Sequence, residues 1–216
     1  MIRKLFGFLT LLLFCLPGCA LLKEPEPLNL ITLRTPLPEV TLCETPMPSQ
    51  IVVVAPDMAG GLRTDRIAML FDEREIRYLA GAKWEAQVPA LIQRQLVRYL
   101  NATGCFSGAG TEASGLSSRY RLQSDVQRLH LCYYGKDDAP SAEIVLRLSI
   151  LDVERGRILE AKTIAFREKS RGKETNQLMD ALDNVVYRAM LDSARWTAGV
   201  MRAHSEPAGA AAKTGK

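Results

Sequence analysis

Histidine is scarce in this sequence: His130 and His204 are the only two among 216 residues. Ser/His/Asp and Cys/His nucleophilic centres both need an imidazole base, and His204 lies where a small, polar tail begins. His130 stands between Leu129 and Leu131 in an alternating segment, which indicates an ordinary strand residue. The glycines of "MAGGLR" lack the spacing of a phosphate-binding loop. The sequence therefore indicates a protein that is not an enzyme.

Clustered metal ligands are also missing. His130 and Cys132 are two apart on an expected strand and could share a metal, but no third ligand is placed by spacing. We expect no metal and no cofactor. Cys43, Cys105 and Cys132 are the cysteines that follow Cys19, enough for one disulfide in an oxidising compartment. Cys105 could pair with Cys132 or with Cys43; we take Cys105–Cys132 as the candidate, and the sequence alone does not choose.

No apolar run is long enough to cross a bilayer. The longest, "LFGFLTLLLFCL" from Leu5 to Leu16, has twelve residues broken only by Thr10, and it follows Arg3 and Lys4. This is the pattern of an export signal over residues 1–18 rather than of a membrane helix. Without the signal the chain has 26 Lys and Arg against 24 Asp and Glu, too near neutrality to favour nucleic acid as a partner.

The residues "LPGC", 16–19, resemble a bacterial lipobox. The resemblance implies cleavage between Gly18 and Cys19, a diacylglycerol thioether on Cys19, and acylation of the new amine, typically with palmitate. The alternative is plain secretion, with cleavage after Ala20 at an A-x-A-like site. Two or more acyl chains give stable membrane attachment. Ala20 rather than Asp after the cysteine implies, by the same resemblance, the outer membrane, facing the periplasm.

Proline is concentrated just after Cys19, with six prolines between Lys23 and Ser49. Such spacing favours extended chain over regular structure. We therefore expect four segments: the signal peptide 1–18, a lipidated cysteine with a proline-rich tether over 19–49, a folded domain over 50–203, and a disordered tail over 204–216.

Hydrophobic periodicity predicts an α+β fold, with a mixed or antiparallel sheet covered on one face by two amphipathic helices. Strands are expected at 28–34 (a short edge strand), 50–56, a hairpin over 66–80, an alternating strand over 119–134, and a hairpin over 142–168 that turns at Arg155–Gly156. The alternation changes phase near Gln127–Arg128, which predicts a β-bulge. Helices are expected from about 85–88 to Gly104 and over 175–202, with a glycine- and serine-rich loop over 107–118.

A family resemblance extends from residue 28 to about 200. It is carried by "IVVVAPDMAGGLRTDRIAML", by "EIRYLAGAKWEAQVPALIQRQLVRYLNATG", by "SSRYRLQSDVQRL" and by a late "ARW". Within these stretches the pattern residues are Gly61, Leu62, Arg66, Ile67, Tyr78 and Trp84. The chain resembles the ABC-type transport auxiliary lipoproteins, which are accessory to MCE (mammalian cell entry) lipid-transport systems and include the Pqi lipoprotein. "LNLITLR" lacks the aromatic residue expected in the family's first strand.

The resemblance implies a non-enzymatic, lipid-anchored component that docks the periplasmic MCE assembly to the outer membrane. Its partners would be the outer-membrane lipid, reached through acylated Cys19, and the MCE protein with its ABC permease and ATPase; self-association to a homo-oligomer is also open. A lipid-binding periplasmic module and an adaptor for envelope or peptidoglycan assembly are the alternatives. Tyr78 and Trp84 bracket "LAGAK", an expected loop, and would either pack the helix onto the sheet or form a partner surface.

Overall fold

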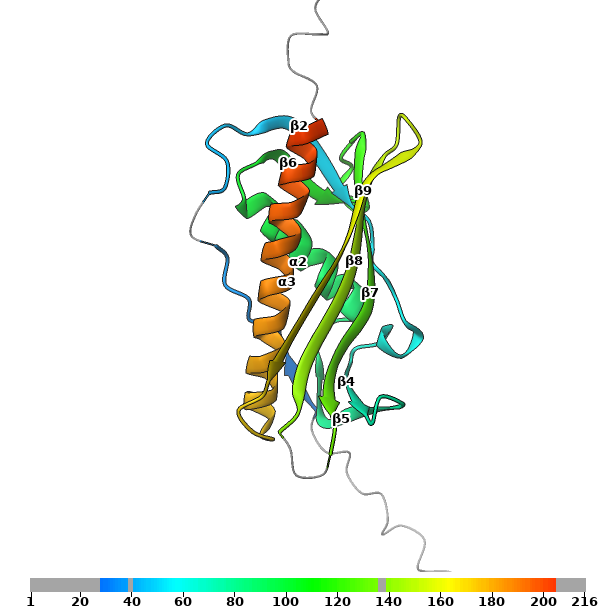
Figure 1. Cartoon of the computed structure of the whole chain (residues 1–216), viewed down its shortest axis with the longest axis vertical. Coiled ribbons are helices and arrows are strands. Elements are labelled where there is room, and N and C mark those ends of the chain that lie inside the picture. The colour runs from blue at the N-terminus through cyan, green and yellow to red at the C-terminus, as the bar shows by residue number, and fades with distance from the viewer. Residues whose placement is uncertain (1–27, 39–40, 136–138, 205–216) are drawn as a thin grey trace, which may run out of the picture.

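The computed structural model describes residues 28–38, 41–135 and 139–204. Over these residues a nine-stranded mixed sheet carries two helices, and both helices lie on the same side of it (Figure 1). The expected α+β architecture, with one sheet face covered by helices, is confirmed. The helices are α2 (Val88–Ala102) and α3 (Thr175–His204).

Strand β7 (Tyr120–Tyr133) is the centre of the sheet. Along one edge it pairs antiparallel with β8 (Ser141–Asp152), which pairs with β9 (Arg157–Lys169). Its other edge meets three strands in succession, all parallel to it: β2 (Met47–Val53), β3 (Asp57–Met58) and β4 (Arg66–Phe71). The sheet is completed by β5 (Glu75–Trp84), β1 (Asn29–Ile31) and β6 (Phe106–Thr111), in the order β1-β5-β4-β7-β2-β6.

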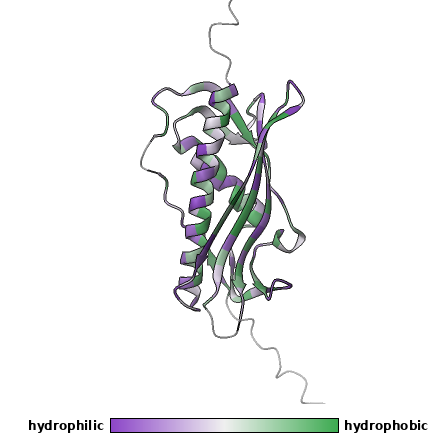
Figure 2. Ribbon diagram, viewed as in Figure 1, coloured by the Kyte–Doolittle hydropathy of each residue, from purple (hydrophilic) through white to green (hydrophobic). Residues whose placement is uncertain are grey.

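The alternating segments form the strands that their pattern predicts. Hydrophobic and hydrophilic residues alternate along β7, β8 and β9 (Figure 2), and Ile144, Leu146 and Leu148 of β8 are fully buried under the helices. The register between β7 and β8 shifts between Val126 and Arg128, which confirms the predicted bulge. The β8–β9 turn contains Gly156 at φ 60°, a backbone conformation that glycine adopts without steric cost.

Two predictions about loops are wrong. Residues 106–111 form β6 instead of a loop, because parallel pairing with β2 and two hydrogen bonds between the Asn101 side chain and the Ala109 backbone supply what "FSGAGT" lacks in strand propensity. "LAGAK" likewise continues β5 as far as Trp84, between β4 and β1.

Helix boundaries follow local chemistry. Pro89 lies in the first turn of α2, where its missing N–H costs nothing, and Gly104 follows the helix at φ 65°. Helix α3 begins at Thr175 as expected and runs along the long axis of the molecule (Figure 1). The core fills the space between the helices and the sheet, with Ile92, Leu96, Leu131, Val185 and Ala189 nearly inaccessible to solvent.

Candidate functional site

The extended segment before β2 is bound to the domain along its described length. We call residues 29–38 and 41–47 the N-terminal strap. At its start, Asn29 and Ile31 pair with Ala82 and Trp84 of β5, and the Glu85 N–H donates to the Ile31 carbonyl at 2.9 Å. Residues 29–38 and 41–47 thus belong to the folded domain, whereas the sequence predicted a tether as far as residue 49.

Beyond β1 the strap crosses both helices. The Thr35 hydroxyl donates to Gln95 Oε1 of α2 at 2.9 Å, and the Tyr99 hydroxyl donates to the Pro36 carbonyl at 2.6 Å. Leu33 and Thr35 are buried. Proline favours extended chain without regular pairing, and here the Tyr99 side chain supplies a hydrogen bond to the Pro36 carbonyl.

An arginine of the strap meets two carboxylates of α3. The Arg34 backbone N–H donates to Asp183 Oδ1 at 3.0 Å, and its guanidinium lies 3.1 Å from Asp180 Oδ1 and 3.6 Å from Asp183 Oδ2. Burial raises the pKa of Asp183 to about 6, even though the Arg34 amide and charge lower it. The strap and α3 are therefore joined by a contact in which the Asp183 carboxyl becomes protonated in mildly acidic solution.

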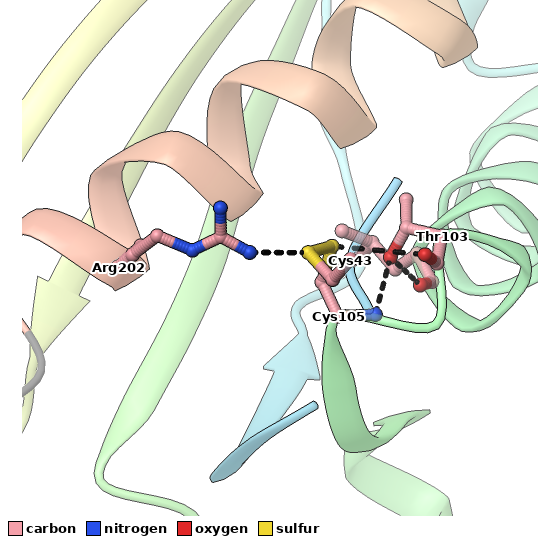
Figure 3. Close-up of a disulfide and its surroundings, with 5 residues drawn as sticks. Cys43, Thr103, Cys105 and Arg202 are labelled. Carbon is pink, nitrogen blue, oxygen red and sulfur yellow. Dashed lines mark hydrogen bonds between the residues drawn. A yellow bond between two sulfur atoms is a disulfide. The ribbon is translucent and has the colours of Figure 1, made fainter. Parts of the chain in front are cut away.

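A disulfide between Cys43 and Cys105 fixes the far end of the strap (Figure 3). Beside it the Leu42 N–H donates to the Thr103 carbonyl at 2.9 Å and the Met47 N–H to the Cys105 carbonyl at 2.8 Å. From the end of α3, Arg202 Nη2 lies 2.7 Å from Cys43 Sγ (Figure 3). The bridge thus gathers the strap, the α2–β6 connection and the end of α3 at one point.

The disulfide corrects the Cys105–Cys132 pairing that we took as the candidate. Cys105 precedes β6 at one edge of the sheet, next to the start of β2. Cys132 lies at the far end of β7, twelve residues beyond the Tyr120 that pairs with β2, which is roughly 40 Å of strand. No backbone adjustment brings such cysteines within bonding distance.

Cys132 remains a free, buried thiol. Its S–H donates to Glu143 Oε2 at 3.4 Å, and burial raises its pKa to about 11. Burial also lowers the pKa of His130, whose Nδ1 has no hydrogen-bond partner among the described residues. Within the described ranges no three His, Cys, Asp or Glu side chains gather as metal ligands. The arrangement favours a neutral histidine and an unreactive thiol.

The two aromatic candidates for a partner surface lie along β5. Trp84 is only 3% exposed and belongs to the core, so its ring is not available to a partner. Tyr78 is half-buried: its hydroxyl donates to the Gly61 carbonyl at 3.1 Å, and the Arg66 guanidinium lies 4.5 Å from the ring centroid. Both contacts indicate a packing role for these rings.

Cys19, the predicted lipidation site, lies outside the described residues. The strap contacts were not foreseen from the sequence. One signal was present: Gln95 is a polar residue within the apolar stripe of α2, and such a residue needs a specific partner. None of the described helices has the length and apolar character that crossing a membrane requires.

Comparison with known proteins places these features in context. The family model described as "ABC-type transport auxiliary lipoprotein component" matches residues 32–192. Among solved structures, protein XCC0632 from Xanthomonas campestris, of the DUF330 family, aligns with a TM-score of 0.71 and 20% identity over 83% of this chain and 99% of its own. An uncharacterized protein aligns with a TM-score of 0.61 and 14% identity, covering 80% and 99% of the two chains. The comparison with curated proteins gave no match.

Proposed function

The chain belongs to the family of ABC-type transport auxiliary lipoprotein components, and from that premise we propose that it docks an MCE-type ABC transport system to the outer membrane. In this role acyl chains on Cys19 hold the protein in the inner leaflet, facing the periplasm. The folded domain offers the periplasmic MCE protein, with its permease and ATPase, a fixed surface. The cargo would be lipids or other hydrophobic molecules.

The single observation that carries the proposal is the attachment of the N-terminal strap. A pull on the acylated cysteine acts first on β1 and then on the rest of the strap, which the Cys43–Cys105 disulfide fixes near its far end. Hydrogen bonds that the strap donates to Gln95 and Asp183, and one that it accepts from Tyr99, hold the segment between these points. Such an attachment suits a mechanical adaptor, since it passes force from the anchor to the whole domain.

The described side chains give no support to a catalytic function. His130 and Cys132 are buried, and burial lowers the pKa of His130 and raises that of Cys132, so both side chains stay neutral. A cavity of about 420 Å³ beside β1 is lined by Leu30, Ile31 and Met179 but also by Arg34 and Asp183. Its charged lining does not suit an enclosed acyl chain, so it offers little support for a domain that carries lipid itself.

Intact mass and membrane fractionation of wild type and Cys19→Ser test the anchor. We expect the wild type to start at Cys19, to carry the mass of a diacylglycerol and a further acyl group, and to fractionate with the outer membrane. Cys19→Ser should be released from the membrane, while the control Cys132→Ser should stay attached. A wild-type protein that starts at Leu21 without added mass would overturn the anchor.

A pull-down from membranes solubilised in mild detergent tests the docking. The MCE protein and its ABC components should copurify with the acylated protein. Enrichment of envelope- or peptidoglycan-assembly proteins instead would contradict the proposal and favour an adaptor for that machinery. Lipid that copurifies with the unacylated domain would favour a lipid carrier, and light scattering of the same sample measures any self-association.

A further inference from the structure

The distance between Cys19 and the folded domain is short. β1 begins at Asn29, and Leu28 is the first described residue, nine positions after Cys19. Nine residues span at most about 30 Å even when fully extended. The start of β1 must therefore stay within that distance of the membrane surface if Cys19 is acylated.

The residues at this point are apolar and exposed. Leu30 of β1 and Leu28, just before this strand, are 64% and 57% exposed. A single exposed leucine needs no explanation on a protein surface. Two exposed leucines at the start of the edge strand, where the described chain begins, form a feature that a lipid surface can cover.

The same end of the molecule carries more exposed apolar side chains. Ile76, next to the β4–β5 turn, is 42% exposed, and Tyr134, just after β7, is 41% exposed. In Figure 1 these elements and β1 lie toward the end of the long axis where α3 begins, and the end of α3 lies at the other. The described residues with large exposed apolar side chains at that other end are Val153 and Ile158 of the β8–β9 hairpin.

Two arginines at this end form ion pairs within the protein. Arg77 Nη2 lies 2.7 Å from Glu75 Oε2, and Arg34 pairs with Asp180 and Asp183. Salt screens exposed charges, whereas the burial of apolar surface is not screened, so we take apolar contact as the main interaction of this end with the bilayer. Varying the charge of the lipid tests this choice against attraction by basic side chains.

We propose that the β1 end of the domain rests on the bilayer, with Leu28 and Leu30 at the boundary between headgroups and acyl chains. The contact rests on the proposed acylation of Cys19, which keeps these leucines near the lipid at all times. It adds to that anchor a second, non-covalent contact that sets which way the domain faces.

A spin label on an introduced cysteine measures the contact directly. The mature acylated chain carrying Leu30→Cys is labelled with a maleimide nitroxide and reconstituted in vesicles of phosphatidylethanolamine with a minority of phosphatidylglycerol. Ile158→Cys, 56% exposed on the opposite hairpin, is the matched control. Cys43 and Cys105 are joined and Cys132 is buried with a pKa near 11, so none of them competes for the label.

We expect the ratio of oxygen to aqueous-chelate accessibility to be several-fold higher at position 30 than at position 158. Omitting phosphatidylglycerol should leave the ratio unchanged. Equal, water-like ratios in a protein whose intact mass confirms acylation would overturn the contact while leaving the anchor. A chain without acyl mass would overturn both. A ratio at position 30 that falls when phosphatidylglycerol is omitted would contradict the apolar contact and favour attraction by charge.

Discussion

Gly104 shows how one residue fixes the position of the strap. It adopts φ 65°, and a Cβ placed on it would come within 2.5 Å of Thr41 Cγ2 of the strap. Both the left-handed backbone and the close approach of a second segment require glycine at this position. The sequence marked Gly104 as a helix end, and the structure adds the packing of the strap against it.

Gly104→Ala should lower the free energy of unfolding by about 2–3 kcal/mol, from the left-handed strain and the forced displacement of Thr41. Gly156→Ala is the matched control, because Gly156 has φ 60° with no atom near its added Cβ. It should cost only about 1 kcal/mol. Chemical denaturation measures both, and adding Thr41→Ser to Gly104→Ala should recover part of the loss. An equal loss of unfolding free energy in the two variants would show that the approach of Thr41 to Gly104 adds nothing to the requirement for glycine.

Asp183 gives the stability of the protein a specific pH dependence. Burial raises its pKa from 3.8 to about 6, so the folded state binds a proton more readily than the unfolded state. Its contribution to stability is therefore fully present below about pH 4 and is lost as the pH rises through 6. Asp152 acts in the opposite direction: hydrogen bonds from Arg119 lower its pKa to about 2.

Asp183→Asn should remove that dependence while leaving an oxygen to accept the Arg34 N–H. The difference in unfolding free energy between wild type and variant, measured from pH 4 to 7, should shift in favour of the variant as the pH rises. Asp180→Asn, a half-exposed neighbour that contacts the same arginine, should leave the dependence in place. A difference curve for Asp183→Asn that is flat across this range would contradict the assignment.

At the scale of elements, the strap depends on its disulfide. The Cys43–Cys105 bridge closes a loop of 62 residues that contains β2, β3, β4, β5 and α2. Cys43→Ser combined with Cys105→Ser should lower the free energy of unfolding by about 3–4 kcal/mol, because the unfolded chain regains loop entropy. Limited proteolysis should then cut within residues 41–47.

Reduction supplies the control for that prediction. A reducing agent should bring the wild type to the stability of the double variant and leave the variant unchanged. If the wild type loses no stability on reduction, the bridge does not hold the strap.

The elements that were predicted correctly have patterns that are readable within one segment. The bulge near Arg128, the hairpin at Gly156 and both helices follow from phase, turn chemistry and apolar stripes. Strand β6 and the end of β5 were missed because their stability comes from pairing with β2 and β1, which lie far away in sequence. The disulfide partner of Cys105 was open for the same reason: only the sheet order brings Cys43 close.

We predicted a tether for the strap because prolines favour extended chain, and an extended chain can also pack against the surface of a helix. Nothing local distinguishes a solvated extended segment from one bound by Gln95 and Tyr99. The sequence therefore placed the boundary of the domain at residue 50, and the structure places it near residue 29.

At the scale of the whole molecule, binding of the strap shortens the link that the proposed acylation of Cys19 would leave between membrane and domain. Residues 20–28 remain between Cys19 and β1 in place of the expected thirty-residue tether. An insertion of about 20 Gly and Ser residues after Ala20 should leave acylation, folding and partner binding intact. Transport in a complementation assay should fall, because the docked assembly would no longer be held at a fixed distance. Full complementation by the insertion variant would show that the height of the domain does not matter.

Helix α3 amplifies any tilt of the domain at its β1 end. Its 30 residues make a rod of about 45 Å along the long axis, starting at the end near β1 (Figure 1). A 10° rocking of the base would move the far end sideways by roughly 8 Å, more than the width of a strand. The far end of α3 is where Arg202 contacts the Cys43–Cys105 disulfide. Its position relative to a supporting surface is therefore fixed only if the β1 end of the domain is held on that surface without tilting.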